Sequence, residues 1–361
     1  MKKHNYSAGP CILPQEVFEK SSDAILNFNN SGLSILEISH RSKDFIAVMD
    51  EARALALELL GLEGKGYQAL FLQGGASLEF LMVPYNLMRE NGKAAYLDTG
   101  TWASAAIKEA KIFGNTEIVA SSKEENYNYI PKNYSVPADA DYFHCTSNNT
   151  IFGTQMKEFP STNVPVVCDM SSDIFSRQLD FSKFDIIYAG AQKNMGPAGT
   201  TLVVIKEEIL GKNGRTIPSM LDYLKHIKAE SMYNTPSVFA VYASMLTLQW
   251  LKKSGGIAAI EKLNTEKATL LYSEIDRNPL FKGTANVADR SMMNACFLLE
   301  NEDHAPIFDA LWKAAGIIGL PGHRSVGGYR ASMYNALSLE SVQVLVDVMQ
   351  DFESKISDVN F

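Results

Sequence analysis

The sequence predicts an α/β protein in which helices cover both faces of a mostly parallel, seven-stranded sheet, followed by a smaller C-terminal α/β domain. Three observations carry this prediction. From about residue 67 onward, short apolar runs alternate with stretches of helical period, which is typical of a parallel sheet covered by helices. The 361 residues exceed one ordinary domain and indicate two. The chain also breaks at Gly255-Gly256, where we expect a domain boundary.

Seven apolar runs have the length of strands. They are Tyr67–Leu72, Ala94–Leu97, Glu117–Ala120, Asp141–Cys145, Val164–Cys168, Asp185–Tyr188 and Thr200–Ile205. Only residues 189–199 separate the last two runs, which is too little chain for a covering helix. We therefore expect these two strands to be antiparallel neighbours.

Helical patterns precede, separate and follow these strands. In the first part they are Asp44–Leu60, with Gly61 at its C-cap, Leu78–Met88, Trp102–Ile112 and a long helix from Pro236 toward Gly255. In the C-terminal part they are a long helix, Ala305–Ala315 and Glu340–Phe352, and a strand is expected around Cys296–Leu299. We expect residues 1–15 to pack near the small domain, 16–256 to form the large domain, which would hold the cofactor, and 257–361 to form the small one.

Composition excludes several classes of partner. The formal net charge of -8 would repel nucleic acid and anionic membranes. No apolar run approaches the roughly 20 residues of a membrane span, and the N-terminus lacks the apolar segment of a signal peptide. The four cysteines form no CxxC pair and have no histidine at zinc spacing, so we expect no metal site. We also expect the thiols to be reduced and the protein to be cytoplasmic. The cysteines are Cys11, Cys145, Cys168 and Cys296.

An aspartate and a lysine follow neighbouring predicted strands. Asp169 lies just past the end of one strand and Lys193 just past the end of the next. Because strand C-termini line the ligand crevice of a parallel sheet, both side chains should converge there. Pyridoxal phosphate (PLP) requires such a pair: a lysine to bind it covalently and a carboxylate to keep its pyridine nitrogen protonated. Singly, these residues are more often a helix N-cap and a solvated loop lysine, but the Gly-Pro-Ala-Gly turn after Lys193 favours the cofactor.

Other residues fit the remaining parts of PLP. Residues 74–77, Gly-Gly-Ala-Ser, lie between a strand and a helix, as a phosphate site demands, although such a stretch alone is most often a tight turn. Trp102, at a helix start, is placed to lie flat on the cofactor ring, and Thr150 to donate to its phenolic oxygen. Alone, these two residues would be read as a packing residue and an ordinary turn.

Two His-Arg pairs point to an anionic substrate. They are His40-Arg41 and His323-Arg324, and Arg330 ends the glycine-rich stretch of the second pair. Arginine grips carboxylate or phosphate with two hydrogen bonds. Either pair alone would be interpreted as a surface arginine in a salt bridge and a histidine whose hydrogen bonds are all made within the protein. Three arginines and two histidines exceed the need of one carboxylate, so we expect a substrate that also carries a phosphate.

Five motifs carry a resemblance that spans essentially the whole chain. They are Tyr6–Pro10 (YSAGP), Ile38–Arg41 (ISHR), Tyr188–Gly199 (YAGAQKNMGPAG), Asn234–Pro236 (NTP) and Gly322–Ser332 (GHRSVGGYRAS). In these residues the chain resembles the phosphoserine aminotransferase family, class V members of the fold-type I PLP-dependent enzymes. The resemblance implies ping-pong transfer of an amino group from L-glutamate to 3-phosphohydroxypyruvate, giving O-phospho-L-serine and 2-oxoglutarate in L-serine biosynthesis.

The resemblance also implies roles for individual residues. Lys193 and Asp169 would be catalytic, and the second subunit of a homodimer would contribute Asn234 and Thr235. The implied cofactor-binding residues are Ala76, Ser77, Trp102, Thr150, Asp169, Gln192, Lys193, Asn234 and Thr235, and the implied substrate-binding residues are His40, Arg41, His323, Arg324 and Arg330. One departure is visible: some relatives have Gly-Arg where this chain has Ala76-Ser77, so backbone donors survive but the charge of an arginine does not.

Three alternatives stay open from the residues alone. A related class V aminotransferase would act on a non-phosphorylated keto acid, as serine–glyoxylate enzymes do, but would leave the two His-Arg pairs unexplained. A cysteine desulfurase needs a cysteine in an exposed loop, whereas three of the four lie in strand-like runs. A PLP-binding regulator without turnover would carry a DNA-binding module or basic patch, and none is visible. The sequence also leaves open whether 4-phosphohydroxy-L-threonine is a second substrate.

Overall fold

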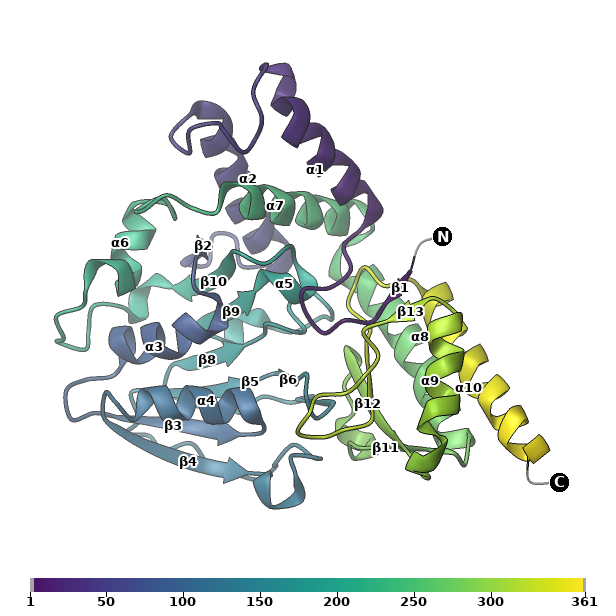
Figure 1. Ribbon diagram of the computed structural model, residues 1–361. Coiled ribbons are helices and arrows are strands. Elements are labelled where there is room, and N and C mark those ends of the chain that lie inside the picture. The colour runs from purple at the N-terminus through teal and green to yellow at the C-terminus, as the bar shows by residue number, and fades with distance from the viewer. Residues whose placement is uncertain (1–2, 360–361) are drawn as a thin grey trace.

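The computed structural model describes residues 3–359, and its centre is a seven-stranded sheet in the order β2-β10-β9-β8-β5-β3-β4 (Figure 1). The strands are β2 (Tyr67–Leu72), β3 (Lys93–Asp98), β4 (Asn115–Ser121), β5 (Tyr142–Thr146), β8 (Val166–Asp169), β9 (Ile186–Gly190) and β10 (Thr201–Lys206). β10 is antiparallel to both of its neighbours, β2 and β9, and the other neighbouring pairs are parallel. The predicted seven-stranded sheet and its antiparallel pair are confirmed.

Helices cover both faces of this sheet because its strands are apolar on both sides. In β2, Phe71 packs into the core under one set of helices, while Leu70 and Leu72 face the other set. The first face is covered by α1 (Gln15–Asn27), α2 (Lys43–Leu60) and α7 (Val238–Lys253), and the second by α3 (Gly75–Leu87), α4 (Thr101–Ala110) and α6 (Tyr223–Lys228).

Local sequence signals set the ends of the predicted helix in α2. The side chain of Ser42 accepts a hydrogen bond from the backbone N–H of Phe45 at the N-terminus. Gly61 ends the helix in the left-handed region at φ 64°, which glycine adopts without steric cost. Helices α1 and α6 were not predicted, and α7 begins at Val238 rather than at Pro236.

The C-terminal part contains a three-stranded sheet in the order β11-β12-β14 and three helices. These elements are β11 (Phe281–Gly283), β12 (Asn294–Leu299), β14 (Tyr329–Ser332), α8 (Gly256–Arg277), α9 (Ala305–Ala314) and α10 (Leu339–Val359). They enclose a second apolar core. α10 continues past the predicted end at Phe352 because the apolar pattern continues, with Ile356 buried one turn later.

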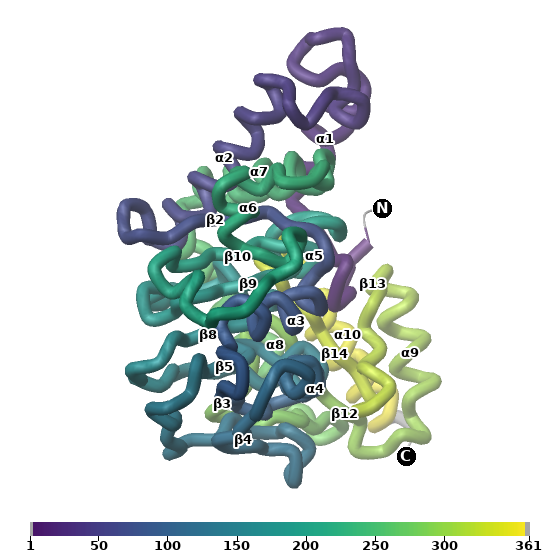
Figure 2. The backbone as a smooth tube through the Cα atoms, turned by 90° about the vertical axis from the view of Figure 1, so that its left-hand side faces the viewer, coloured from purple at the N-terminus to yellow at the C-terminus, as the bar shows by residue number. Residues whose placement is uncertain are grey.

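The N-terminal segment lies against this C-terminal part. β1 (His4–Asn5) pairs in parallel with β13 (Ile317–Ile318), and Figures 1 and 2 both show the two strands side by side. α8 contributes Ile257 to the core of the large sheet and Leu271 to the second core, so the division of the chain at residue 256 stays a prediction. Residues 1–2 and 360–361 of the expected terminal units lie outside the described residues.

Several short strands and helical turns connect the larger elements. They are β6 (Asn148–Asn149), β7 (Thr154–Gln155) and α5 (Ala191–Asn194), in addition to several single turns of 3-10 helix. All four cysteines are free thiols, and all but Cys11 are buried. Within residues 3–359, none of the helices combines the length and the apolar character that crossing a membrane requires.

Candidate active site

Asp169 and Lys193 stand at the C-terminal ends of neighbouring parallel strands. Asp169 is the last residue of β8, and Lys193 lies in α5, the single helical turn that follows β9. The Asp169 side chain is buried, with the residue only 5% exposed, and its Oδ1 accepts a hydrogen bond from the backbone N–H of Ser171 at 2.9 Å. Asp169 therefore belongs to the strand and does not cap a helix, and the predicted convergence of the two residues at this edge is found.

The charges of these two residues act on each other. Burial lowers the pKa of the Lys193 amine, the Asp169 carboxylate opposes that shift, and the Arg330 guanidinium adds to it. Burial raises the pKa of Asp169, whereas Lys193 and the hydrogen bonds from Ser171 lower it. A lysine amine with a lowered pKa is more readily deprotonated, which is the form that can act as nucleophile or base.

Trp102 and Thr150 lie beside the lysine. Trp102 is in the first turn of α4, and its indole N–H donates to Thr150 Oγ1 at 3.3 Å. Lys193 Nζ lies 5.8 Å from the centroid of the Trp102 ring. A Cβ on Gly100 would come within 2.8 Å of Asn149 Oδ1, so a glycine there lets the two loops approach. Trp102 is 38% exposed, and its ring therefore offers a flat surface next to the lysine amine.

The glycine stretch between β2 and α3 forms an open helix N-terminus. Gly74 has φ 104° and a Cβ there would lie 2.5 Å from Leu78 Cβ, so only glycine fits. α3 begins at Gly75 with no side-chain cap, which leaves the first N–H groups, those of Ala76 and Ser77 among them, free to bind an anion.

Asn234 and Thr235 contact the residue before this stretch. Asn234 Nδ2 donates to Gln73 Oε1 at 2.9 Å, and Gln73 Nε2 donates to the backbone oxygen of Thr235 at 3.3 Å. Both residues thus lie beside the glycine stretch of their own chain. Their contribution from a second subunit stays a prediction.

Gln192 precedes Lys193 in α5 and lies over the end of β9. A Cβ on Gly190 would come within 2.7 Å of Gln192 Oε1, so this glycine makes room for the glutamine side chain. The position next to Lys193 agrees with the expected role in holding the cofactor, which stays a prediction.

Arg330 brings the C-terminal part to the site. It lies on β14, and its Nη1 donates to the backbone oxygen of Thr150 at 3.2 Å. Its Nε is buried and has no hydrogen-bond partner in the described part of the chain, so one face of the guanidinium is available to an anion.

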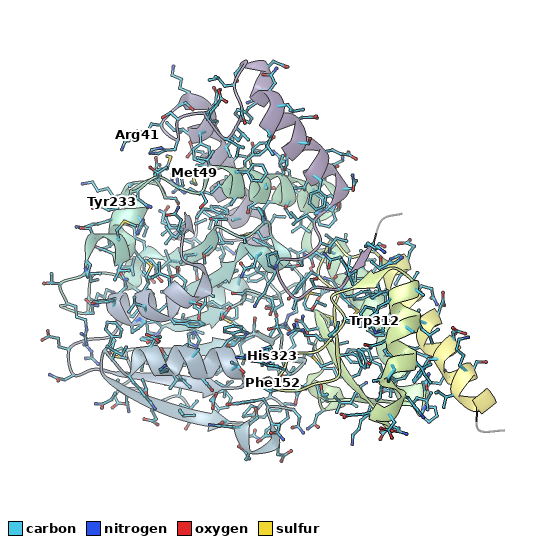
Figure 3. All side chains as sticks on the ribbon, in the orientation of Figure 1. Arg41, Met49, Phe152, Tyr233, Trp312 and His323 are labelled. Carbon is cyan, nitrogen blue, oxygen red and sulfur yellow. The ribbon has the colours of Figure 1, made fainter. Side chains whose placement is uncertain are left out.

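His323 and Arg324 lie in the loop just before β14. His323 Nδ1 is 2.7 Å from Ser325 Oγ, and burial together with the charges of Arg330 and Arg324 lowers the pKa of His323. These contacts place the second His-Arg pair close to Arg330. Phe152, two residues beyond Thr150, lines one pocket together with Ser325 and Val326 of this loop, and Figure 3 shows His323 and Phe152 in the same region.

The first His-Arg pair is elsewhere. His40 and Arg41 lie between α1 and α2, and Figure 3 shows Arg41 on the same side as Tyr233 and far from His323. One chain therefore does not bring both pairs to one substrate. The reason is tertiary, because His40 and Arg41 lie in the segment before α2 whereas His323 and Arg324 lie in the loop before β14.

Three residues near the lysine were missed in the sequence. The Cys11 thiol donates to the backbone oxygen of Lys193 at 2.5 Å, and a Cβ on Gly9 would lie 3.2 Å from Lys193 Cγ. Ser171 binds Asp169, as described above. The Tyr-Ser-Ala-Gly-Pro motif and a serine two residues after the aspartate were the available signals for these contacts.

The residues present fit PLP. Lys193 Nζ has no hydrogen-bond or ion-pair partner among residues 3–359, which leaves it free for a covalent bond to an aldehyde. The exposed face of Trp102 matches a flat ring, buried Asp169 matches a ring nitrogen that must stay protonated, and the Gly74–Gly75 turn matches a phosphate.

Comparisons with known proteins agree with this geometry. The aminotransferase class-V family model matches residues 4–345. The chain is 83% identical to the phosphoserine aminotransferase of Flavobacterium johnsoniae, covering 99% of this chain and 100% of that protein, and 57% identical to that of Parabacteroides distasonis, covering 98% and 100%.

Solved structures give the same result. The phosphoserine aminotransferase from Bacillus circulans subsp. alkalophilus superposes with a TM-score of 0.95 at 43% identity, covering 98% of this chain and 99% of that one. The PLP-bound phosphoserine aminotransferase from Trichomonas vaginalis superposes with a TM-score of 0.92 at 36% identity, covering 97% and 100%. The chain therefore belongs to the phosphoserine aminotransferase family, within the PLP-dependent class V aminotransferases of fold type I.

Proposed function

We propose that this chain transfers the amino group of L-glutamate to 3-phosphohydroxypyruvate by a ping-pong reaction, giving 2-oxoglutarate and O-phospho-L-serine for L-serine biosynthesis. The observation that carries the proposal is the unpartnered amine of Lys193, which lies among Trp102, Asp169 and Arg330. When bound, PLP supplies an aldehyde for reversible covalent attachment of amines and a pyridinium ring that withdraws electrons. A lysine, a flat aromatic surface, a carboxylate and a carboxylate-binding arginine are the groups that this chemistry needs.

Lys193 and Asp169 divide the proton chemistry. Asp169, which is buried, would face the ring nitrogen of bound PLP and hold the proton there. Lys193, whose amine would hold PLP, would also be the base that takes the proton from Cα of glutamate and the acid that returns a proton to Cα of the product in the second half-reaction. The lowered pKa of Lys193 suits both directions, because the amine must exchange protons near neutral pH.

The cationic groups recognise the substrates. Arg330 binds the α-carboxylate, since its Nε is free and its Nη1 is fixed by Thr150. His323, Arg324, His40 and Arg41 bind the phosphate of the phosphorylated substrates. Glutamate presents a second carboxylate to the same groups, so one set of cations serves both half-reactions.

A homodimer with shared sites would unite the two His-Arg pairs. Arg41 lies far from His323 within one chain, and the end of α1 and the segment between α1 and Arg41 expose Leu26, Leu33 and Leu36, an apolar set that an interface would cover. Mixing a Lys193→Ala chain with an Arg41→Ala chain tests this directly. If sites are shared, mixed dimers contain an intact site and regain activity that neither parent has; a mixture as inactive as its parents, or an active monomer in sedimentation, contradicts the proposal.

We place the enzyme in the cytoplasm, on the support of its four free thiols. The substrate class is tested with the purified holoenzyme and glutamate, comparing 3-phosphohydroxypyruvate with unphosphorylated hydroxypyruvate as amino acceptor. We expect strong preference for the phosphorylated acceptor; equal rates would favour a class V aminotransferase for unphosphorylated keto acids. Lys193→Ala should lose turnover and the adduct that borohydride traps, and retention of either would refute the role of this lysine.

A further inference from the structure

Three asparagines with no assigned role form a buried network behind the site. Asn194 directly follows Lys193 in α5, Asn335 lies just beyond β14, and Asn264 lies on α8. They are 6%, 3% and 0% exposed, respectively. Buried amides are costly unless they are hydrogen-bonded, so their partners indicate what the network holds.

Hydrogen bonds join the three asparagines in sequence, one of them through a backbone N–H group. The backbone N–H of Asn335 donates to Asn194 Oδ1 at 2.8 Å. Asn264 Nδ2 donates to Asn335 Oδ1 at 2.8 Å. The network thus joins the helix turn that carries Lys193 to the chain leaving β14, which carries Arg330.

Each asparagine also binds one of three consecutive backbone oxygens in the loop that follows Asp169. Asn194 Nδ2 donates to Ile174 O at 2.6 Å, and Asn335 Nδ2 donates to Phe175 O at 3.0 Å. Asn264 Nδ2 donates to Ser176 O at 3.0 Å. Phe175 has φ 58°, a conformation that a bulky residue adopts only when its surroundings hold it there.

We infer that Asn194, Asn335 and Asn264 are positioning residues that hold Lys193, Asp169 and Arg330 in one fixed arrangement. The inference rests on the proposed function of Lys193. Asparagine suits this place because one neutral side chain supplies both an acceptor and donors. A charged side chain in this place would shift the pKa values of Lys193 and Asp169, whereas a neutral amide leaves those pKa values to the interaction between the two residues.

The alternative is that the network only adds stability where the two cores meet. Each bond would then contribute about 1 kcal/mol, and its loss would not reach the chemistry. A positioning role requires more, because a shift of about 1 Å in a reacting group can cost roughly 100-fold in rate. The two readings therefore differ in which measurements change, and stability alone does not separate them.

The test uses the holoenzyme with Asn335→Ala and a matched control, Asn278→Ala. Asn278 is also a buried asparagine, 1% exposed, that donates to Glu274 Oε1 and Met349 O and accepts from Leu280 N. It lies at the end of α8, apart from the network. The control should lose at least as much thermal stability, since Asn278→Ala deletes three amide hydrogen bonds and Asn335→Ala deletes two.

Only the Asn335→Ala variant should change the active site. We expect kcat/KM for glutamate to fall at least about tenfold, with a rise in KM because Arg330 is no longer held, and a smaller loss with the control. The pH midpoint of the visible absorbance of the Lys193-bound cofactor should rise, because Arg330 lowers the pKa of Lys193 and would move away. Asn335→Ala matching the control in both measurements would overturn the inference.

Two further outcomes keep the test decisive. If Asn335→Ala does not fold, Asn264→Ala removes the outer link while leaving Asn335 bound to Asn194, and a smaller change in the same direction is expected. Asn264→Ala also deletes two hydrogen bonds, those from Asn264 Nδ2 to Asn335 Oδ1 and to Ser176 O, but farther along the network from Lys193. If wild-type protein gives no borohydride-trapped adduct on Lys193, the proposed function itself is refuted. If wild type is active and Asn335→Ala behaves like the control, only the positioning role is refuted.

Discussion

Glu79 should make the stability of the protein depend on pH around neutrality. It lies in α3, one turn beyond the open N-terminus that we propose binds the cofactor phosphate, and it is 0% exposed. Its Oε2 accepts a hydrogen bond from Tyr223 Oη at 2.5 Å, while Oε1 has no partner among the residues described. Burial raises the pKa of Glu79 from 4.5 to about 7, although the hydrogen bond from Tyr223 opposes this shift.

The sign and size of the effect follow from proton binding. Between pH 4.5 and 7 the folded state keeps the proton on Glu79 and the unfolded chain does not. The contribution to stability is therefore fully present below pH 4.5 and is lost as pH rises through about 7. The difference between the two pKa values corresponds to about 3 kcal/mol in the free energy of unfolding.

Glu79→Gln should remove this dependence. The amide keeps an acceptor for Tyr223 but cannot ionise, so the variant should gain about 2 to 3 kcal/mol relative to wild type between about pH 5 and pH 8. Urea unfolding of both holoenzymes at the two pH values measures the gain, and the exposed Glu300→Gln is the control that should show none. If the difference between Glu79→Gln and wild type is the same at both pH values, the carboxyl does not titrate in this range and the reasoning fails.

Three further predictions concern the site and its support. Lys267 Nζ is buried and donates to Met333 O and Tyr334 O, and burial lowers the pKa of Lys267 from 10.5 to about 7, so its contribution to stability is lost as pH falls toward 7. In urea unfolding, Lys267→Met should therefore weaken the rise in the free energy of unfolding between about pH 7 and pH 9 by up to roughly 3 kcal/mol. An unchanged rise would contradict this prediction. Trp102→Ala removes the flat surface and the bond to Thr150, so we expect about tenfold weaker PLP binding in a spectrophotometric titration, whereas unchanged affinity would rule out stacking. Asp169→Asn keeps the shape but not the charge, so single-turnover rates with glutamate should fall roughly 100-fold with PLP still attached; a normal rate would show that this carboxylate does not hold the ring proton.

Several elements could be predicted because their signals are local. β2 has the predicted bounds, Tyr67–Leu72, since its six residues, apolar apart from Gln68, lie between Gly66 and Gly74. α2 ends at Leu60 because Gly61 follows it. Asp169 and Lys193 were found because each stands where a strand ends, and chain order alone places such positions at one edge of a parallel sheet.

Other features could not be predicted because distant segments create them. The Cys11 thiol reaches Lys193 only because the segment after β1 packs against α5, although the two residues are 182 positions apart in the chain. The network of Asn194, Asn335 and Asn264 depends on three segments that meet only after both parts of the chain have folded. A single asparagine in each segment carries no pattern that would mark it.

The sequence by itself determined the order of the strands and of most helices, the positions of Asp169 and Lys193 at strand ends, and the number of arginines and histidines that could meet an anionic substrate. Those features depend on periodicity and on residue type, which neighbouring residues suffice to specify. The tertiary structure alone decided that Arg330 lies near Lys193 and His323 near Arg330, while Arg41 lies far from His323. The sequence specifies the chemical type of each side chain, but the distances between side chains are set only when apolar surfaces pack and fix the position of each segment.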